Sequence, residues 1–185
     1  NNSADQGIGC TTLGACGKKG ETAGLQDLLM YVGRGIAVWG KKGAEYNVFD
    51  KAAAVFVTEA LFMTITNANF DDERFVAQIK EAQVVRDRVR DSFLAAYKAK
   101  TGQDFDGELD ACATWASDDV ADLHKRFLEV GVLATENEDI RSLRELVIYG
   151  LKGLAAYVEH AAVLGHEDDD VYRFLFEALA STTAD

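Results

Sequence analysis

Two stretches of the chain match each other at an offset of 118 residues. Leu25–Asn47 reads LQDLLMYVGRGIAVWGKKGAEYN, and Leu143–Gly165 reads LRELVIYGLKGLAAYVEHAAVLG. The register continues without a gap from Val55–Leu61 (VFVTEAL) to Arg173–Leu179 (RFLFEAL). This period is far longer than that of a solenoid repeat. We therefore expect one unit, a long helix followed by a turn and a second helix, to occur twice by internal duplication.

Apolar spacing and capping residues predict helices through most of the chain. Apolar residues recur at helical spacing over about 22–42, and the segment from about 51 to 67 is apolar almost all round. We expect further helices at about 70–100, 118–130, 136–164 and 168–182, with an N-cap at Asn69 or Asp71, another at Ser117, a capping box of Thr135 and Glu138, and C-terminal glycines at Gly102, Gly131 and Gly165. No useful stretch alternates as a strand does, so the predicted fold class is all-α.

The predicted helices divide the chain into four regions. Residues 1–21 form a loop rich in glycine and cysteine, 22–102 a first three-helix bundle, 103–116 a connector, and 117–185 a second three-helix bundle related to the first by duplication. A glycine inside a helix costs about 1 kcal/mol relative to alanine. The recurrence of Gly35 as Gly153 therefore predicts a close helix crossing in both bundles.

The repeat also predicts two ion pairs. Glu59 is the only charged residue between Ala52 and Phe70, and Glu177 occupies the equivalent position in the second unit. A buried carboxylate needs a partner, because an unpaired one costs several kcal/mol or stays protonated. The basic position that the units share in the preceding helix is Arg34, which becomes Lys152. We expect the pairs Arg34–Glu59 and Lys152–Glu177, unless each glutamate reaches solvent at a helix edge.

Charge and composition exclude several classes of protein. The chain is 48% apolar and 27% charged, as globular proteins are, and its net charge of −12 argues against binding to nucleic acid. No apolar run approaches the roughly 20 residues that span a bilayer, and no signal-peptide pattern opens the chain. Three cysteines, an odd number, indicate a reducing compartment. We expect a cytoplasmic protein that binds neither membranes nor nucleic acid.

The N-terminal loop holds the residues best suited to bind a cofactor. Cys10 and Cys16 have five residues between them and are flanked by Gly9, Gly14 and Gly17. Glycine beside cysteine lets backbone N–H groups turn toward sulfur, as iron–sulfur clusters require. A zinc or cubane site takes four ligands, however, so two cysteines in a flexible loop remain an equally good interpretation.

The same loop, GCTTLGACGKKGETAGLQDLL, resembles the N-terminal region of the hybrid-cluster (prismane) protein family, whose members are known as hydroxylamine reductases. The strings TNANFDDERF, LAAYKAKTGQDF and VGVLATENEDIRSLREL extend the resemblance over essentially the whole chain. It implies an iron–sulfur oxidoreductase that reduces hydroxylamine to ammonia, with nitric oxide as a further candidate substrate. It also implies a redox partner such as an NADH-dependent iron–sulfur flavoprotein.

The resemblance implies that Cys10 and Cys16 are the third and fourth ligands of a [4Fe-4S] cluster. The first two, a C-x-x-C pair, are expected at or before residue 1, so this chain supplies half a site. The hybrid iron–sulfur–oxo cluster takes its ligands from later domains, so we expect the chain alone to be inactive and to contact the remaining domains of its parent polypeptide. Cys112 matches no ligand and is expected to be a small buried hydrophobe.

Two other interpretations remain. The chain is a metal-free helical interaction or scaffold domain in the first, and a member of the wider carbon monoxide dehydrogenase superfamily in the second. The histidines do not add a metal site, because a di-iron bundle needs Glu-x-x-His and none of the three has a glutamate three positions before it. The three are His124, His160 and His166.

Overall fold

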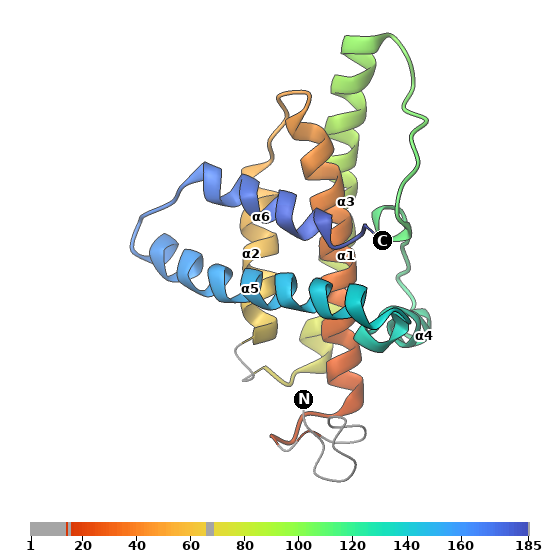
Figure 1. Cartoon of the computed structure of the whole chain (residues 1–185), viewed down its shortest axis with the longest axis vertical. Coiled ribbons are helices and arrows are strands. Elements are labelled where there is room, and N and C mark those ends of the chain that lie inside the picture. The colour runs from red at the N-terminus through yellow and green to blue at the C-terminus, as the bar shows by residue number, and fades with distance from the viewer. Residues whose placement is uncertain (1–13, 15, 66–68, 185) are drawn as a thin grey trace.

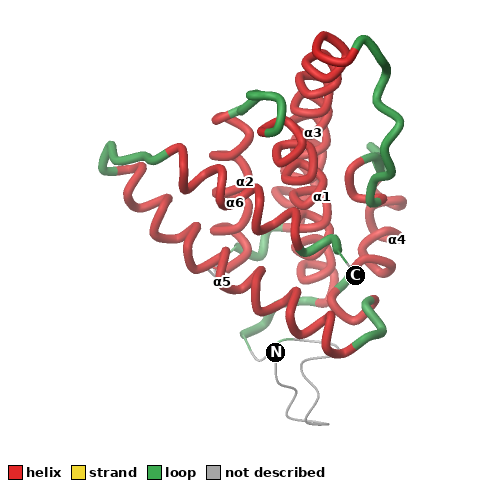
Figure 2. Tube along the Cα trace, turned by 45° about the horizontal axis from the view of Figure 1, so that its top comes forward, coloured by secondary structure: helices red, strands yellow, loops and turns green. Residues whose placement is uncertain are grey.

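The computed structural model describes residues 14, 16–65 and 69–184, and these fold into α-helices joined by loops and two short 3-10 helices (Figure 1). The elements are α1 (Gly20–Ala44), α2 (Lys51–Ile65), α3 (Asp72–Thr101), η1 (Ala111–Ala113), α4 (Val120–Val130), η2 (Val132–Ala134), α5 (Glu138–Val163) and α6 (Asp169–Ser181). The described part of the chain has no β-strand, as Figure 2 also shows. The all-α prediction is confirmed.

Most helix ends lie where the capping residues predict them. Asp71 caps α3 by accepting a hydrogen bond from the backbone N–H of Arg74, and Gly102 ends it with a left-handed φ of 74°. The cap of α4 is wrong by two residues, because Asp119 caps the helix and the Ser117 hydroxyl accepts from the N–H of Asp119 instead.

The predicted capping box before α5 is also wrong. Asn137 is the N-cap, and its side-chain oxygen accepts hydrogen bonds from the backbone N–H groups of Asp139 and Ile140. Thr135 does not cap the helix. Its hydroxyl oxygen accepts a hydrogen bond from Arg144, and its carbonyl oxygen accepts one from Arg141. Asparagine binds the first N–H groups at least as well as threonine does, so the helix starts two residues later.

The helices predicted for the first bundle, α1, α2 and α3, pack together, and the bounds of that bundle stay a prediction. α1 packs along α3 and against α2, and α2 in turn contacts α3. The ring of Trp39 of α1 contacts the rings of Phe93 of α3 and Phe105, and its indole N–H donates to the carbonyl of Ala113 at 2.9 Å. Arg86 of α3 is fully buried and donates to the carbonyl of Trp115 and to Asp87. These bonds fasten the connector that follows α3 to the bundle.

The helices predicted for the second bundle, α4, α5 and α6, pack more against α1 and α2 than against one another. α5 and α6 run across α1 and α2 (Figure 1), with α1 packed on α6 and α2 packed on α5. α4 packs chiefly against α1 rather than beside α5 and α6. One continuous core therefore joins both halves of the described chain. The predicted boundaries at 102 and 117, and the duplication itself, stay predictions.

The two repeat glycines have different surroundings. A Cβ atom on Gly35 would lie 2.1 Å from the carbonyl oxygen of Cys112, so η1 approaches α1 as closely as only glycine permits. A Cβ on Gly153 would meet no atom within 4 Å. The predicted helix crossing is therefore wrong in the first unit, where a 3-10 turn makes the close approach. In the second unit no described residue approaches Gly153, and the crossing stays a prediction.

Candidate functional site

Cys16 lies in a tight turn just before α1. The turn spans 14–18: the N–H of Gly14 donates to the carbonyl of Lys18, and the N–H of Gly17 donates to the carbonyl of Gly14, both at 2.8 Å. Gly17 has a φ of 88°, a conformation that favours glycine. The Cys16 thiol is exposed, and its sulfur would lie 3.0 Å from a Cβ on Gly14. The glycines beside this cysteine thus shape the turn around sulfur.

This loop does not complete a cubane site on its own. Cys10, the other predicted ligand, lies outside the described residues. Among the residues that are described, no three His, Cys, Asp or Glu side chains are grouped so that they could hold a metal ion. A cubane cluster takes four thiolates. The chain's two candidate ligands therefore fit half of such a site, and their role stays a prediction.

The remaining cysteine and two of the histidines make contacts within the fold. Cys112 is buried in η1, and burial, reinforced by Asp110, raises the pKa of its thiol well above the usual range, as expected for a small hydrophobe. His124 pairs with Glu21 at 3.1 Å. His160 makes an edge contact with the ring of Phe62 on α2.

Both predicted ion pairs are wrong. The Glu59 side chain is exposed. Partial burial of its carboxyl group and the negative charge of Glu159 on α5 raise its pKa, whereas a bound basic partner would lower it. Glu177 is exposed on α6, at the rim of the pocket that α6 forms with α1. α2 packs against α1, α5 and α6, yet one narrow edge of it faces solvent, and Glu59 lies on that edge.

The basic residues of the repeat lie near a different acidic pair. Asp27 and Glu145 are equivalent in the 118-residue register, and so are Arg34 and Lys152. All four line one small cavity of about 20 Å³ where the start of α5 approaches α1. That space is sufficient for about one water molecule with polar partners. The sequence analysis did not predict this cluster. Its signal in the sequence is that an acidic and a basic position both keep their charge 118 residues later.

Burial dominates the electrostatics of this cluster. It raises the pKa of Asp27 to about 6, with Glu145 contributing and the charges of Lys152 and Arg34 opposing. Burial likewise lowers the pKa of Lys152, against the attraction of Asp27. The Nε atom of Arg34 is buried and has no hydrogen-bond partner among the described residues. The cluster therefore lies between the two repeat units, and burying its charged groups costs free energy.

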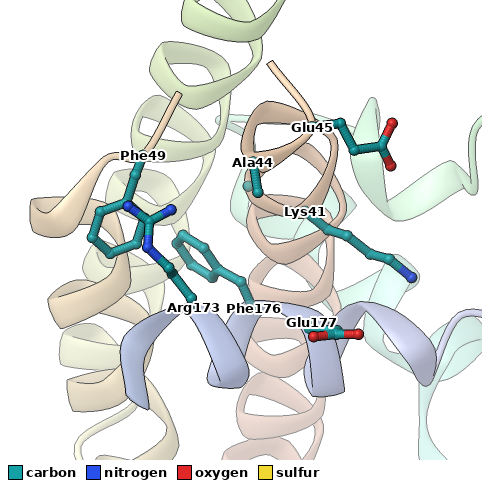
Figure 3. A pocket seen from close by; sticks show the side chains of 8 residues that line it. Lys41, Ala44, Glu45, Phe49, Arg173, Phe176 and Glu177 are labelled. Carbon is teal, nitrogen blue, oxygen red and sulfur yellow. The ribbon is translucent and has the colours of Figure 1, made fainter. Parts of the chain in front are cut away.

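A second pocket, of about 210 Å³, lies between the end of α1 and α6 (Figure 3). Its floor is aromatic: Phe176 packs against Gly40 of α1, and the guanidinium of Arg173 stacks on Phe49 at 4.0 Å. Lys41 and two glutamates line its rim. The residues that line it include no cysteine, histidine, serine or threonine.

The chain resembles known proteins over nearly its whole length. The model of the prismane/CO dehydrogenase family matches residues 5–185. A hydroxylamine reductase of Nitratidesulfovibrio vulgaris is 56% identical over 96% of this chain and 32% of its own length. Those of Halothermothrix orenii and Thermosipho melanesiensis are 53% and 47% identical over 95% and 97% of this chain, and 32% and 33% of their own lengths. The chain thus spans about a third of these relatives.

Proposed function

The chain belongs to the prismane/CO dehydrogenase family, and we propose that it is the N-terminal helical part of an iron–sulfur oxidoreductase that reduces hydroxylamine to ammonia. The observation that carries this proposal is an identity of about one half to relatives named hydroxylamine reductase, across nearly all of the chain. Nitric oxide is a further substrate to test, and a flavoprotein that carries iron–sulfur clusters is the electron donor we propose.

The chain's own contribution is to hold one side of the cluster through which electrons enter. The turn at 14–18 presents Cys16 directly before α1, and α1 is the most extensively packed helix of the fold. A ligand on such a base keeps its position when the charge of a cluster changes. Cys10 would supply the second thiolate, and the two remaining ligands and the hybrid cluster would come from the rest of the polypeptide, in the cytoplasm.

The test compares the full-length polypeptide with the 185-residue chain. Both are purified without oxygen, and iron, sulfide and ammonia formation from hydroxylamine are measured with an artificial electron donor. We expect turnover and clusters in the full-length protein and neither in the 185-residue chain, since cofactors carry this chemistry. A full-length protein that contains clusters and gives no ammonia would refute the proposed activity.

A matched pair of variants tests the ligand role. In the full-length protein, Cys16→Ala should remove about four iron atoms per chain, the content of one cubane cluster. Cys112→Ala removes a buried thiol elsewhere and should leave the iron content unchanged. Equal iron content in both variants would favour the alternative function, a metal-free helical scaffold.

A further inference from the structure

The outer face of α5 is apolar and exposed. Leu143, Leu146 and Tyr157 are 63%, 69% and 79% exposed, and they recur at helical spacing along one side of the helix. The opposite side, with Ile148, Leu151 and Ala155, is buried. An apolar stripe this long is unusual on a monomer and marks a contact surface.

The equivalent positions of the first unit are buried. Leu25, Leu28 and Trp39 of α1 are the register equivalents of the three exposed α5 residues, and each is at most 2% exposed. α1 contacts α2 and α6, and α5 contacts their equivalents α6 and α2. α1 has, in addition, α3 along its length. α5 has no such neighbour in the described part of the chain.

Two glycines on this face have no structural use in the described residues. Gly150 and Gly153 are both open, with no atom within 4 Å of an added Cβ. Gly35, the equivalent of Gly153, is needed because another segment approaches α1 there. Glycine weakens a helix, so its presence at Gly150 and Gly153 is explained if a further segment packs closely on α5.

A groove extends this face to the end of the fold. It has a volume of about 220 Å³, and it lies between Leu143 and Val147 of α5 and Thr182 at the end of α6. In a longer polypeptide, the residues after Ala184 would start beside the groove and could reach α5 without a long loop. In the first unit, α3 likewise follows α2 after a short connection.

We propose that the outer face of α5 is the docking surface for one helix of the longer polypeptide, the counterpart of α3. The register places this helix at 190–219, which is 118 positions after α3. It packs along Leu143, Leu146 and Tyr157, and it approaches α5 at Gly150 and Gly153. The inference rests on the proposed function in one respect: it requires a polypeptide longer than this chain, as the relatives are.

Two other occupants fit the structure less well. α5 is long and apolar enough to cross a membrane by length and composition alone, a test that core helices also pass. Its inner face, however, packs on α2 and carries Lys152 beside Asp27, and a bilayer would separate these contacts. A second copy of the chain would cover the face but would leave the missing counterpart of α3 unexplained.

The first experiment measures whether the face is covered in the full-length protein. Leu146→Cys and the control Val84→Cys place one thiol each at positions that are equally exposed, at 69%, in this structure. Val84 is a single exposed apolar residue on the charged outer side of α3, and such residues are ordinary on protein surfaces. Iodoacetamide alkylation is followed by the mass of the peptide that contains each thiol, in the 185-residue chain and in the full-length protein.

We expect alkylation of Leu146→Cys to slow by at least about tenfold in the full-length protein, since a packed face reacts only through local opening. The rate at Val84→Cys should change by less than about twofold. Unchanged alkylation at Leu146→Cys would overturn the proposal. Equal slowing at both positions would overturn it too, because the protection would not be specific to α5.

The second experiment identifies the occupant. Tyr157 is replaced by the photo-crosslinker p-benzoylphenylalanine in the full-length protein, and the crosslinked peptide is mapped by mass spectrometry. We expect it to lie within 190–219. A crosslink to a later segment, to lipid or to a second chain would refute the assignment. Neither experiment depends on turnover, so a protected face in a protein that does not reduce hydroxylamine would disprove the proposed function and leave this inference standing.

Discussion

Asp27→Asn tests the charge cluster that links the two units. Asp27 is partly buried on α1, and its neighbours are Lys152 and Glu145 of α5 and Arg34 of its own helix. The substitution keeps the size of the side chain and removes its titration. We expect it to abolish one specific pH dependence of the unfolding free energy.

The sign follows from the two pKa values. Burial raises the pKa of Asp27 from 3.8 to about 6, so the folded chain binds this proton more tightly than the unfolded chain does. The stabilisation from this proton is fully present below pH 3.8 and is lost as the pH rises through about 6. At 1.36 kcal/mol per pKa unit, the loss amounts to about 3 kcal/mol for complete titration, and about 2 kcal/mol between pH 4 and pH 7.

The assay is urea unfolding followed by circular dichroism at pH values from about 4 to about 7. The difference in unfolding free energy between the unsubstituted chain and Asp27→Asn should fall by about 2 kcal/mol across this range. Asp91→Asn, which removes an exposed carboxylate on α3, should show no such fall against the same reference. A difference that stays constant with pH for Asp27→Asn, or that rises, would refute the reasoning.

Three further predictions concern stability, each measured by urea unfolding of the 185-residue chain. Gly35→Ala should destabilise the chain by about 2–4 kcal/mol, since the new Cβ would overlap the carbonyl of Cys112. Gly153→Ala should stabilise it by up to about 1 kcal/mol, because the new Cβ meets open space. Similar effects of both substitutions would contradict the difference in packing. Arg86→Met should cost about 1–3 kcal/mol by leaving the Trp115 carbonyl unpaired, and an effect below about 0.5 kcal/mol would show that the bond adds little. Glu59→Ala should change stability by less than about 0.5 kcal/mol, as at other exposed positions, and a large loss would restore the buried ion pair that the structure rejects.

The sequence by itself determined the elements of this protein. Helix positions follow from interactions between residues three or four apart and from caps within one turn. Gly102 could therefore be read directly, and the cap of α3 was narrowed to Asn69 or Asp71. The caps that failed, at Ser117 and Thr135, are those where a better capping residue stood two positions later. The cysteine loop and the family were equally visible, because both are strings of residues in chain order.

Only the tertiary structure decided what the repeated positions do. Glu59 looked buried from the composition of its helix, yet the edge it occupies faces solvent. Gly35 and Gly153 have the same place in the repeat, but η1 approaches one and no described residue approaches the other. Asp27 meets Lys152, 125 positions away, because α5 crosses α1 rather than forming a bundle of its own. Which side chains meet across such a crossing depends on the packing of whole helices, and periodicity within one helix carries no information about its neighbour.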